Sequence, residues 1–226
     1  MLTFKEIPIN YKYTNNAEEA ETWLRELPEL IACDFETASR FKITTKECLK
    51  LSVDRISDLK EKIKISQYIE STGLSHPSLS MVTHLSIAWS DRDAIVLVCD
   101  NDTIMKTMYN YLVTTDNKQL WHNGGNFDFK FIYHHTKKLP KNYIDTLLLA
   151  KTLINDANAN EARVNLKDLM GWKYGRWAQV KEESFTLENM YNETMIKYAA
   201  TDACATYSLY QDIKNDIDAY NNGWNI

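Results

Sequence analysis

The feature that most constrains the fold is a short apolar run that ends in two carboxylates. The run Leu30 to Cys33 is followed by Asp34 and, two residues later, by Glu36. The apolar run predicts a buried strand, and side chains two residues apart on a strand lie on the same face of the sheet. Because two buried carboxylates repel each other unless a cation lies between them, this spacing indicates a site for Mg²⁺ or Mn²⁺, which prefer oxygen ligands. Alternatively, Glu36 is simply exposed where the strand ends.

Composition limits the class of protein. The chain has 226 residues, of which 44% are hydrophobic, so it can bury one sizeable core and we expect a single domain over residues 1–226. Its four cysteines form no Cys-x-x-Cys pair, which is typical of reduced thiols in a cytoplasmic protein. No apolar stretch is long enough for a membrane span, so we expect no membrane partner. The net charge of −5 argues against a general nucleic-acid coat, but it is compatible with a nuclease whose metal ions and basic patches contact phosphates.

The order of the predicted elements indicates an α/β fold. Strand and helix patterns alternate, which predicts a mixed sheet of about five strands with helices on both faces. Ligand sites in such sheets lie at the carboxyl ends of parallel strands, where Asp34 and Glu36 fall. Besides the carboxylate strand, the expected strands cover 83–89, 94–99, 119–122 and 143–144, with 2–13 as a candidate edge strand. The expected helices cover 17–27, 102–113, 127–135, 146–153 and 165–170. One long helix or a pair of helices is expected over 187–218.

Residues 38–80 differ from the rest of the chain. They contain eight basic and five acidic residues, and their apolar residues recur at roughly helical spacing. We therefore expect a helical insertion after the first core strand. It could clamp phosphates or dock a partner protein, or it could be an inert, solvated lobe.

A second group of polar residues lies in the segment His122 to Asp128. This segment follows a predicted strand, contains two glycines and opens a predicted helix, which places Asp128 in the first helical turn. A carboxylate there is favoured by the free N–H groups of the helix, so Asp128 alone is equally well explained as an ordinary helix N-terminal acid. The glycines permit a close turn of the backbone beside a ligand.

A third group is the pair Tyr198 and Asp202, one helical turn apart on the last predicted helix. The alanines around them keep this helix thin, so that it can approach the sheet closely. Taken alone, the pair could also be an ordinary core tyrosine beside an aspartate that caps a helix or is exposed. Together, the three segments supply four acids and one phenol to one predicted edge of the sheet.

The three segments resemble the DEDD superfamily of 3′–5′ exonucleases, in its tyrosine-containing subgroup. This subgroup includes the proofreading domains of bacterial and phage family A DNA polymerases and the ribonuclease D-like enzymes. Its motifs Asp-x-Glu, Asn-x₃-(Phe/Tyr)-Asp and Tyr-x₃-Asp match Asp34–Glu36, Asn123–Asp128 and Tyr198–Asp202. The histidine-containing subgroup would have a histidine where this chain has Lys197. The resemblance covers most of residues 17–212, and the insertion at 38–80 departs from it.

The resemblance implies a ribonuclease H-like fold and a site for two divalent metal ions, Mg²⁺ or Mn²⁺. Asp34 would bridge both ions, Glu36 and Asp202 would hold the ion that carries the attacking water, and Asp128 would serve the second ion. Tyr198 would orient that water, because a phenol, with an ordinary pKa of about 10, is a poor base at neutral pH.

The resemblance also implies contacts with the 3′-terminal nucleotide of a nucleic acid. The expected substrate-binding residues are Thr37, Asn123, Phe127, Arg176 and Trp177. Arg176 and Trp177 lie in a loop that combines charge with aromatic rings, which a single strand could use for stacking. The aromatic residues of this loop could instead fill the core.

The expected function is a metal-dependent 3′–5′ exonuclease that degrades DNA to nucleoside 5′-monophosphates. Because the chain ends soon after the third motif, we expect a stand-alone proofreading or DNA-processing nuclease of a bacterium or phage. Its substrate would be the 3′ end of single-stranded DNA, and a separate DNA polymerase is a candidate partner. Two alternatives stay open: an exoribonuclease related to ribonuclease D, and a catalytically silent module that binds a polymerase or nucleic acid. The presence of all four acids and of Tyr198 argues against the silent module, because such charges would only repel one another without metal ions.

Overall fold

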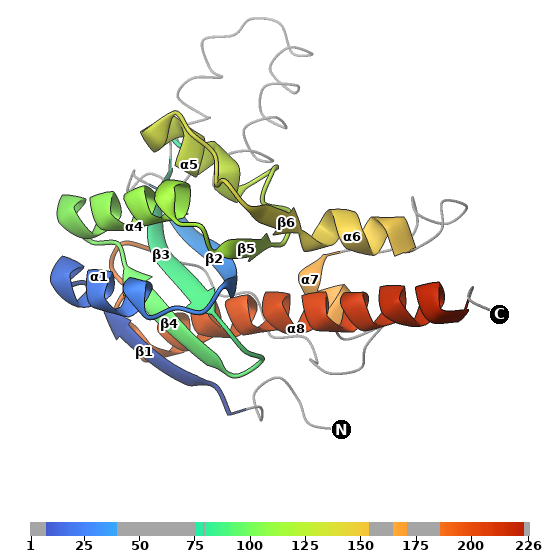
Figure 1. The fold of residues 1–226 in the computed structure, drawn as a ribbon. Helices are drawn as coiled ribbons and strands as arrows, with labels where there is room; N and C mark the ends of the chain where they lie inside the picture. Colours follow the sequence, from blue (N-terminus) through green and yellow to red (C-terminus); the bar gives the residue numbers. More distant parts are fainter. Residues whose placement is uncertain (1–7, 40–75, 79, 154–164, 171–185, 224–226) are drawn as a thin grey trace, which may run out of the picture.

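The computed structural model describes residues 8–39, 76–78, 80–153, 165–170 and 186–223. Its strands are β1 (Asn10–Thr14), β2 (Leu30–Ser39), β3 (Ser80–Ala88), β4 (Asp93–Val98), β5 (Lys118–Trp121) and β6 (Tyr143–Asp145). They form one six-stranded sheet in the order β1-β4-β3-β2-β5-β6 (Figure 1). The central strand β2 is antiparallel to β3 and parallel to β5. The mixed α/β sheet is therefore confirmed, and the candidate edge strand near the N-terminus, β1, is its sixth strand.

Helices cover both faces of the sheet. One face is covered by α1 (Ala17–Arg25), α4 (Asp102–Thr114) and α5 (Asp128–Thr136), and the other packs against α8 (Glu193–Gly223). The helices α6 (Thr146–Leu153) and α7 (Leu166–Asp168) contact α8. Two hydrophobic clusters fill the spaces between these layers. None of the described helices has an apolar stretch that would let it cross a bilayer.

The alternation of side chains along β2 decides where its acids point. Ile31, Cys33 and Phe35 belong to the cluster that β2 shares with α1, α4 and α5, whereas Ala32 belongs to the cluster beside α8. Because alternate residues of a strand share a face, Asp34 and Glu36 face α8. The register between β2 and β3 shifts directly after Glu36, and irregularities of this kind re-aim side chains near active sites.

The helix α8 lies close to the sheet because its contact surface is made of small residues. Ala199, Ala200 and Ala203 are fully buried in the cluster beside β2. The expected helix over 187–218 in fact begins at Glu193, because residues 186–192 form turns and the side chain of Asn192 caps the helix by accepting a hydrogen bond of 2.9 Å from the Thr194 amide.

The expected insertion at 38–80 lies almost entirely outside the described residues. Its two ends are visible, because Ser39 and Ser80 are paired at the end of the β2–β3 ladder. Residues 38–80 therefore leave and rejoin the sheet at neighbouring positions, at the end of β2 that follows Asp34 and Glu36.

Candidate active site

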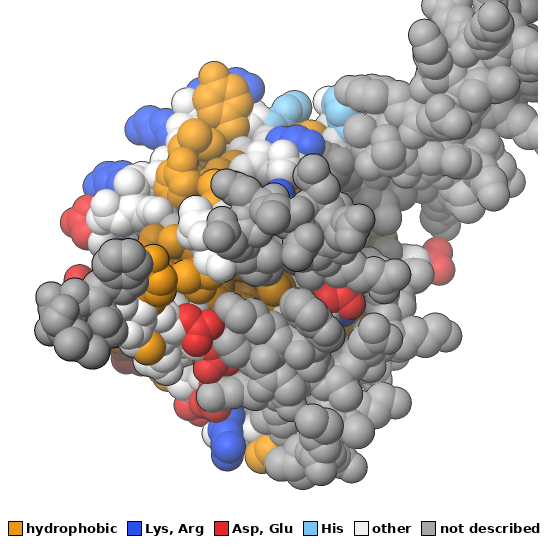
Figure 2. Space-filling view, turned by 90° about the vertical axis from the view of Figure 1, so that its right-hand side faces the viewer, with side chains coloured by type: hydrophobic (Ala, Val, Ile, Leu, Met, Phe, Trp, Pro, Cys, Tyr) orange, Lys and Arg blue, Asp and Glu red, His pale blue; other side chains and the backbone are white. Residues whose placement is uncertain are grey.

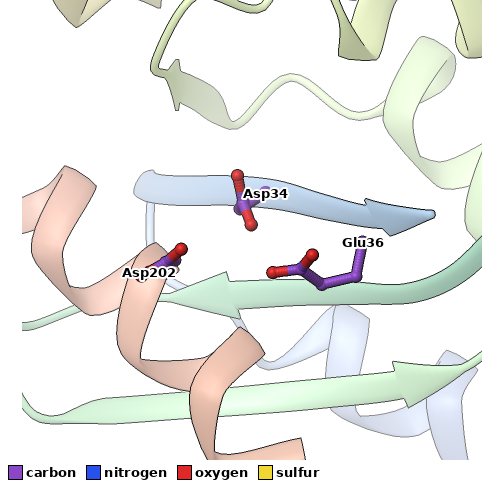
Figure 3. Close-up of side chains that lie close together, drawn as sticks. All are labelled: Asp34, Glu36 and Asp202. Carbon is purple, nitrogen blue, oxygen red and sulfur yellow. The ribbon is translucent and has the colours of Figure 1, made fainter. Parts of the chain in front are cut away.

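Three carboxylates from two distant segments meet between the sheet and α8. Asp34 and Glu36 extend from β2, and Asp202 extends from α8 (Figure 3). Each offers a carboxylate oxygen, and these oxygens all lie within 4.8 Å of one another. Of the residues that the structure describes, these are the only group of three or more with such a spacing among potential metal-ligating side chains. The structure thus brings together the acids of the first and third sequence motifs.

Asp128 lies beside this group but is held differently. It is buried in the first turn of α5, and its Oδ1 accepts a hydrogen bond of 3.1 Å from the backbone amide of Phe35. This amide is available because β5 pairs with β2 only as far as Ala32. Asp128 therefore contacts the backbone of β2 between Asp34 and Glu36, although its carboxylate is not one of the three that surround a common point.

Burial and mutual repulsion make this arrangement costly without a cation. Burial raises the pKa of Asp34 well above its ordinary value, and the charges of Asp128 and Asp202 raise it further. The pKa of Glu36 is also raised well above its ordinary value, first by burial and then by the charges of Asp34 and Asp202. Burial also raises the pKa of Asp128, to about 8. A divalent cation would relieve this repulsion, and oxygen-only ligands suit Mg²⁺ or Mn²⁺, so the residues present fit such an ion.

One residue of the site was not singled out by the sequence. Lys167, on α7, donates a hydrogen bond to the hydroxyl oxygen of Tyr198 and lies 4.0 Å from Oδ2 of Asp202. Its ammonium group is also 4.7 Å from the centre of the Tyr198 ring, and its charge lowers the raised pKa values of Asp34 and Glu36. The sequence predicted the short helix that carries Lys167. A lysine in a helix expected near the acids was the only feature of the sequence that pointed to this residue.

The loop of the second motif is held by local hydrogen bonds and by packing. Asn123 adopts a left-handed backbone conformation with φ of 64°, and its amide donates a 3.0 Å hydrogen bond to Asp145. Gly124 is required because a Cβ there would lie 2.9 Å from Cβ of Trp121, whereas Gly125 has open space around it. Packing against Trp121 and Phe129 therefore excludes a side chain at Gly124.

The remaining expected substrate-binding residues have different positions. Thr37 is buried directly after Glu36, and Phe127 precedes α5 and packs partly against the core. Arg176 and Trp177 lie outside the described residues.

Comparisons with known proteins identify the family of this chain. A family model described as 3′–5′ exonuclease matches residues 43–218, which include the second and third motifs but not Asp34 and Glu36. No curated protein matches the chain by sequence.

Solved structures share the fold at low sequence identity. NrnC of Brucella melitensis aligns with a TM-score of 0.56 at 15% identity, over 95% of this chain and 84% of NrnC. The catalytic core of RRP6 from Trypanosoma brucei aligns with a TM-score of 0.60 at 13% identity, over 94% of this chain and 48% of that one. Escherichia coli RNase D aligns with a TM-score of 0.59 at 12% identity, over 96% of this chain and 47% of RNase D. Since the family model covers well over half of its length, this chain belongs to the 3′–5′ exonuclease family and is a hydrolase of nucleic acid.

Proposed function

We propose that the protein removes nucleotides one at a time from the 3′ end of a DNA strand and releases nucleoside 5′-monophosphates. Its active site would consist of Asp34, Glu36, Asp128, Tyr198 and Asp202. The observation that carries this proposal is the approach of the Asp34, Glu36 and Asp202 carboxylates to within 4.8 Å of one another. Acids from distant segments that meet in a partly buried place repel one another, and a divalent cation between them would offset this repulsion.

The enzymes of this family use divalent metal ions, and the acidic group supports such ions here. Asp34, Glu36 and Asp202 would hold one ion, and Asp34 with Asp128 would hold the second. When bound, such ions lower the pKa of a water molecule and stabilise the charge on the attacking and leaving oxygens. NrnC of Brucella melitensis, which shares the fold, has been solved with bound Mg²⁺, which supports a hard cation here.

The chain's own residues would position the reactants. Tyr198, next to Asp202, would hydrogen-bond to the attacking water and orient it. Thr37, Asn123 and Phe127 lie close to the acids in the sequence and would contact the 3′-terminal nucleotide. Arg176 and Trp177 would contact the strand by charge and stacking.

A basic surface beside the site supports a polyanionic substrate. Residues 129–142 contain four lysines and two histidines but no aspartate or glutamate, in a chain with a net charge of −5. They cover α5 and the loop after it, and the lysines are exposed. In Figure 2, basic and histidine side chains gather in the upper part of the face shown, whereas most acidic side chains lie below them. Lysines arranged in this way favour binding of a phosphate backbone.

A second candidate function is an exoribonuclease. Escherichia coli RNase D is described as an exoribonuclease involved in structured RNA processing, and NrnC has been solved bound to pGG. The sequence Asp34 to Thr37 instead resembles that of the polymerase proofreading members, which favours DNA and a separate polymerase as partner. We further propose that residues 1–226 form one cytoplasmic exonuclease domain in which 38–80 is a helical insertion.

The test is degradation of strands with a 5′ label, in DNA and RNA, single-stranded and double-stranded, with Mg²⁺, Mn²⁺ or EDTA. We expect a ladder that shortens from the 3′ end, depends on the metal ion and is fastest on single-stranded DNA. Nucleoside 5′-monophosphates should be the only products. Faster degradation of RNA would favour the second candidate, and cleavage that persists in EDTA or leaves 3′-phosphates would contradict a two-metal exonuclease.

A further inference from the structure

Lys167 contacts both functional residues of the third motif. Its ammonium group donates a hydrogen bond to the Tyr198 hydroxyl oxygen, lies 4.7 Å from the centre of the Tyr198 ring and is 4.0 Å from Oδ2 of Asp202. Tyr198 and Asp202 are one turn apart on α8, and Lys167 reaches them from α7. A single cation thus joins the phenol and the carboxylate.

The element that carries Lys167 is fixed in place. The side chain of Asn165 caps α7 by accepting a 2.8 Å hydrogen bond from the Asp168 amide. Directly after α7, Leu169 and Met170 are fully buried in the same cluster as the alanines of α8. The backbone of Lys167 is therefore held against α8, and its side chain, which is 26% exposed, does not have to be drawn in from solvent.

The chemistry of the ammonium group determines the direction of the hydrogen bond. A lysine ammonium has three N–H donors and no acceptor, so the hydroxyl oxygen of Tyr198 must accept. The O–H proton of Tyr198 then points away from Lys167 and can be donated to another oxygen.

We propose that Lys167 is a positioning residue of the exonuclease site, which holds Tyr198 as a hydrogen-bond donor toward the attacking water. This inference rests on the proposed function, because it assumes that Tyr198 orients that water. Lys167 itself would touch neither the reacting phosphate nor the water, so its effect should pass through Tyr198.

The test compares K167M, K167Q and K167R with wild type, each also combined with Y198F. We expect K167M and K167Q to lower kcat by about 10- to 100-fold, the value of one charge-assisted hydrogen bond, with little change in KM. K167R keeps the charge and the donors and should recover most of kcat. In the Y198F background, K167M should lower kcat by less than about 3-fold, because the hydroxyl that Lys167 contacts is already absent. Lys197, exposed beside Tyr198 on the same helix, provides the matched control, and K197M should leave kcat unchanged.

A measurement without substrate separates positioning from a structural role. We expect Mn²⁺ titration by calorimetry to show that K167M binds the ion at least as tightly as wild type, because removal of a nearby positive charge leaves the acids more negative. Three results would overturn the proposal: an equal decrease of kcat in the Tyr198 and Y198F backgrounds, abolished Mn²⁺ binding, or unfolding of both K167M and K167Q. An inactive wild type would instead refute the proposed function, whereas an active wild type with an equally active K167M would refute only this inference.

Discussion

At the scale of single residues, the acids of the site lower the stability of the folded, metal-free protein, and the same acids can bind a cation. Asp34 is the clearest case, because burial and the charges of Asp128 and Asp202 all raise its pKa. Replacing it with asparagine removes one of the repelling charges and keeps the shape of the side chain. The substitution should therefore affect activity and stability in opposite directions.

We predict that D34N lowers the cleavage rate by about 10³-fold or more, since metal ions supply several kcal/mol of charge stabilisation in such reactions. The metal-free variant should unfold at the same temperature as the wild type or at a higher one. Cleavage of labelled DNA and thermal denaturation in EDTA measure the two effects. D91N, at an exposed acid of the β3–β4 turn, is the control and should change neither. A lower melting temperature for D34N would show that Asp34 stabilises the fold rather than straining it.

The buried acids also predict how stability depends on pH. Burial raises the pKa of Asp128 from 3.8 to about 8, whereas an aspartate in an unfolded chain titrates near pH 3.9. Between these values the folded protein keeps a proton that the unfolded chain has released, so the free energy of unfolding should fall as pH rises from about 4 to about 8 and level off above that. Asp34 and Glu36, whose pKa values are also raised, contribute with the same sign.

This pH dependence should appear in thermal unfolding of the metal-free protein in EDTA, and it should be weaker in D128N. Added Mn²⁺ should reduce it, because the ion stabilises the ionised carboxylates. If the stability of the metal-free protein instead rose between pH 5 and pH 8, the acids would be ionised and compensated by another group in the fold.

At the scale of elements, the alternation of β2 was predictable and the contacts between elements were not. Side chains alternate between the two faces of β2 from Ile31 to Glu36, which places both acids on one face. That face contacts α8, so the acids of the first and third motifs lie close together. The hydrogen bond that the Phe35 amide donates to Asp128 depends on β5 ending early, and the contact of Lys167 with Tyr198 depends on how α7 packs on α8. No local pattern encodes either distance, because a lysine on a short helix is usually a solvated residue.

The loop between β5 and α5 offers a matched pair of substitutions. A Cβ at Gly124 would lie 2.9 Å from Cβ of Trp121 and 3.1 Å from the ring of Phe129, whereas nothing lies within 4 Å of one at Gly125. We predict that G124A costs about 1–3 kcal/mol of stability, as overpacking does, and lowers activity because the loop also positions Asn123 and Asp128. G125A should have little effect on either. Chemical denaturation and the cleavage assay measure both, and equal effects of the two variants would contradict the packing argument.

At the scale of the whole molecule, the charge distribution suggests where a strand leaves the active site. The helix α5 begins at Asp128, beside the acids, and its nine residues span about 13 Å. Lys130 near its start and Lys138 just beyond its end are both exposed. A strand of only two or three nucleotides would therefore occupy the site without reaching Lys138, whereas a longer strand would pass along this surface.

We predict that K137Q/K138Q, at the two exposed lysines that follow the end of α5, weakens binding of a 20-nucleotide strand in the D34N background but not binding of a dinucleotide. For the long strand, the slope of log affinity against log salt should become less steep by about 0.7 for each phosphate that the protein no longer neutralises. Fluorescence anisotropy over a range of salt concentrations measures both. The control is K118Q/K214Q, at exposed lysines on β5 and α8, which removes the same charge elsewhere. If this control weakened binding of the long strand equally, net charge would explain the binding and the path along α5 would be wrong.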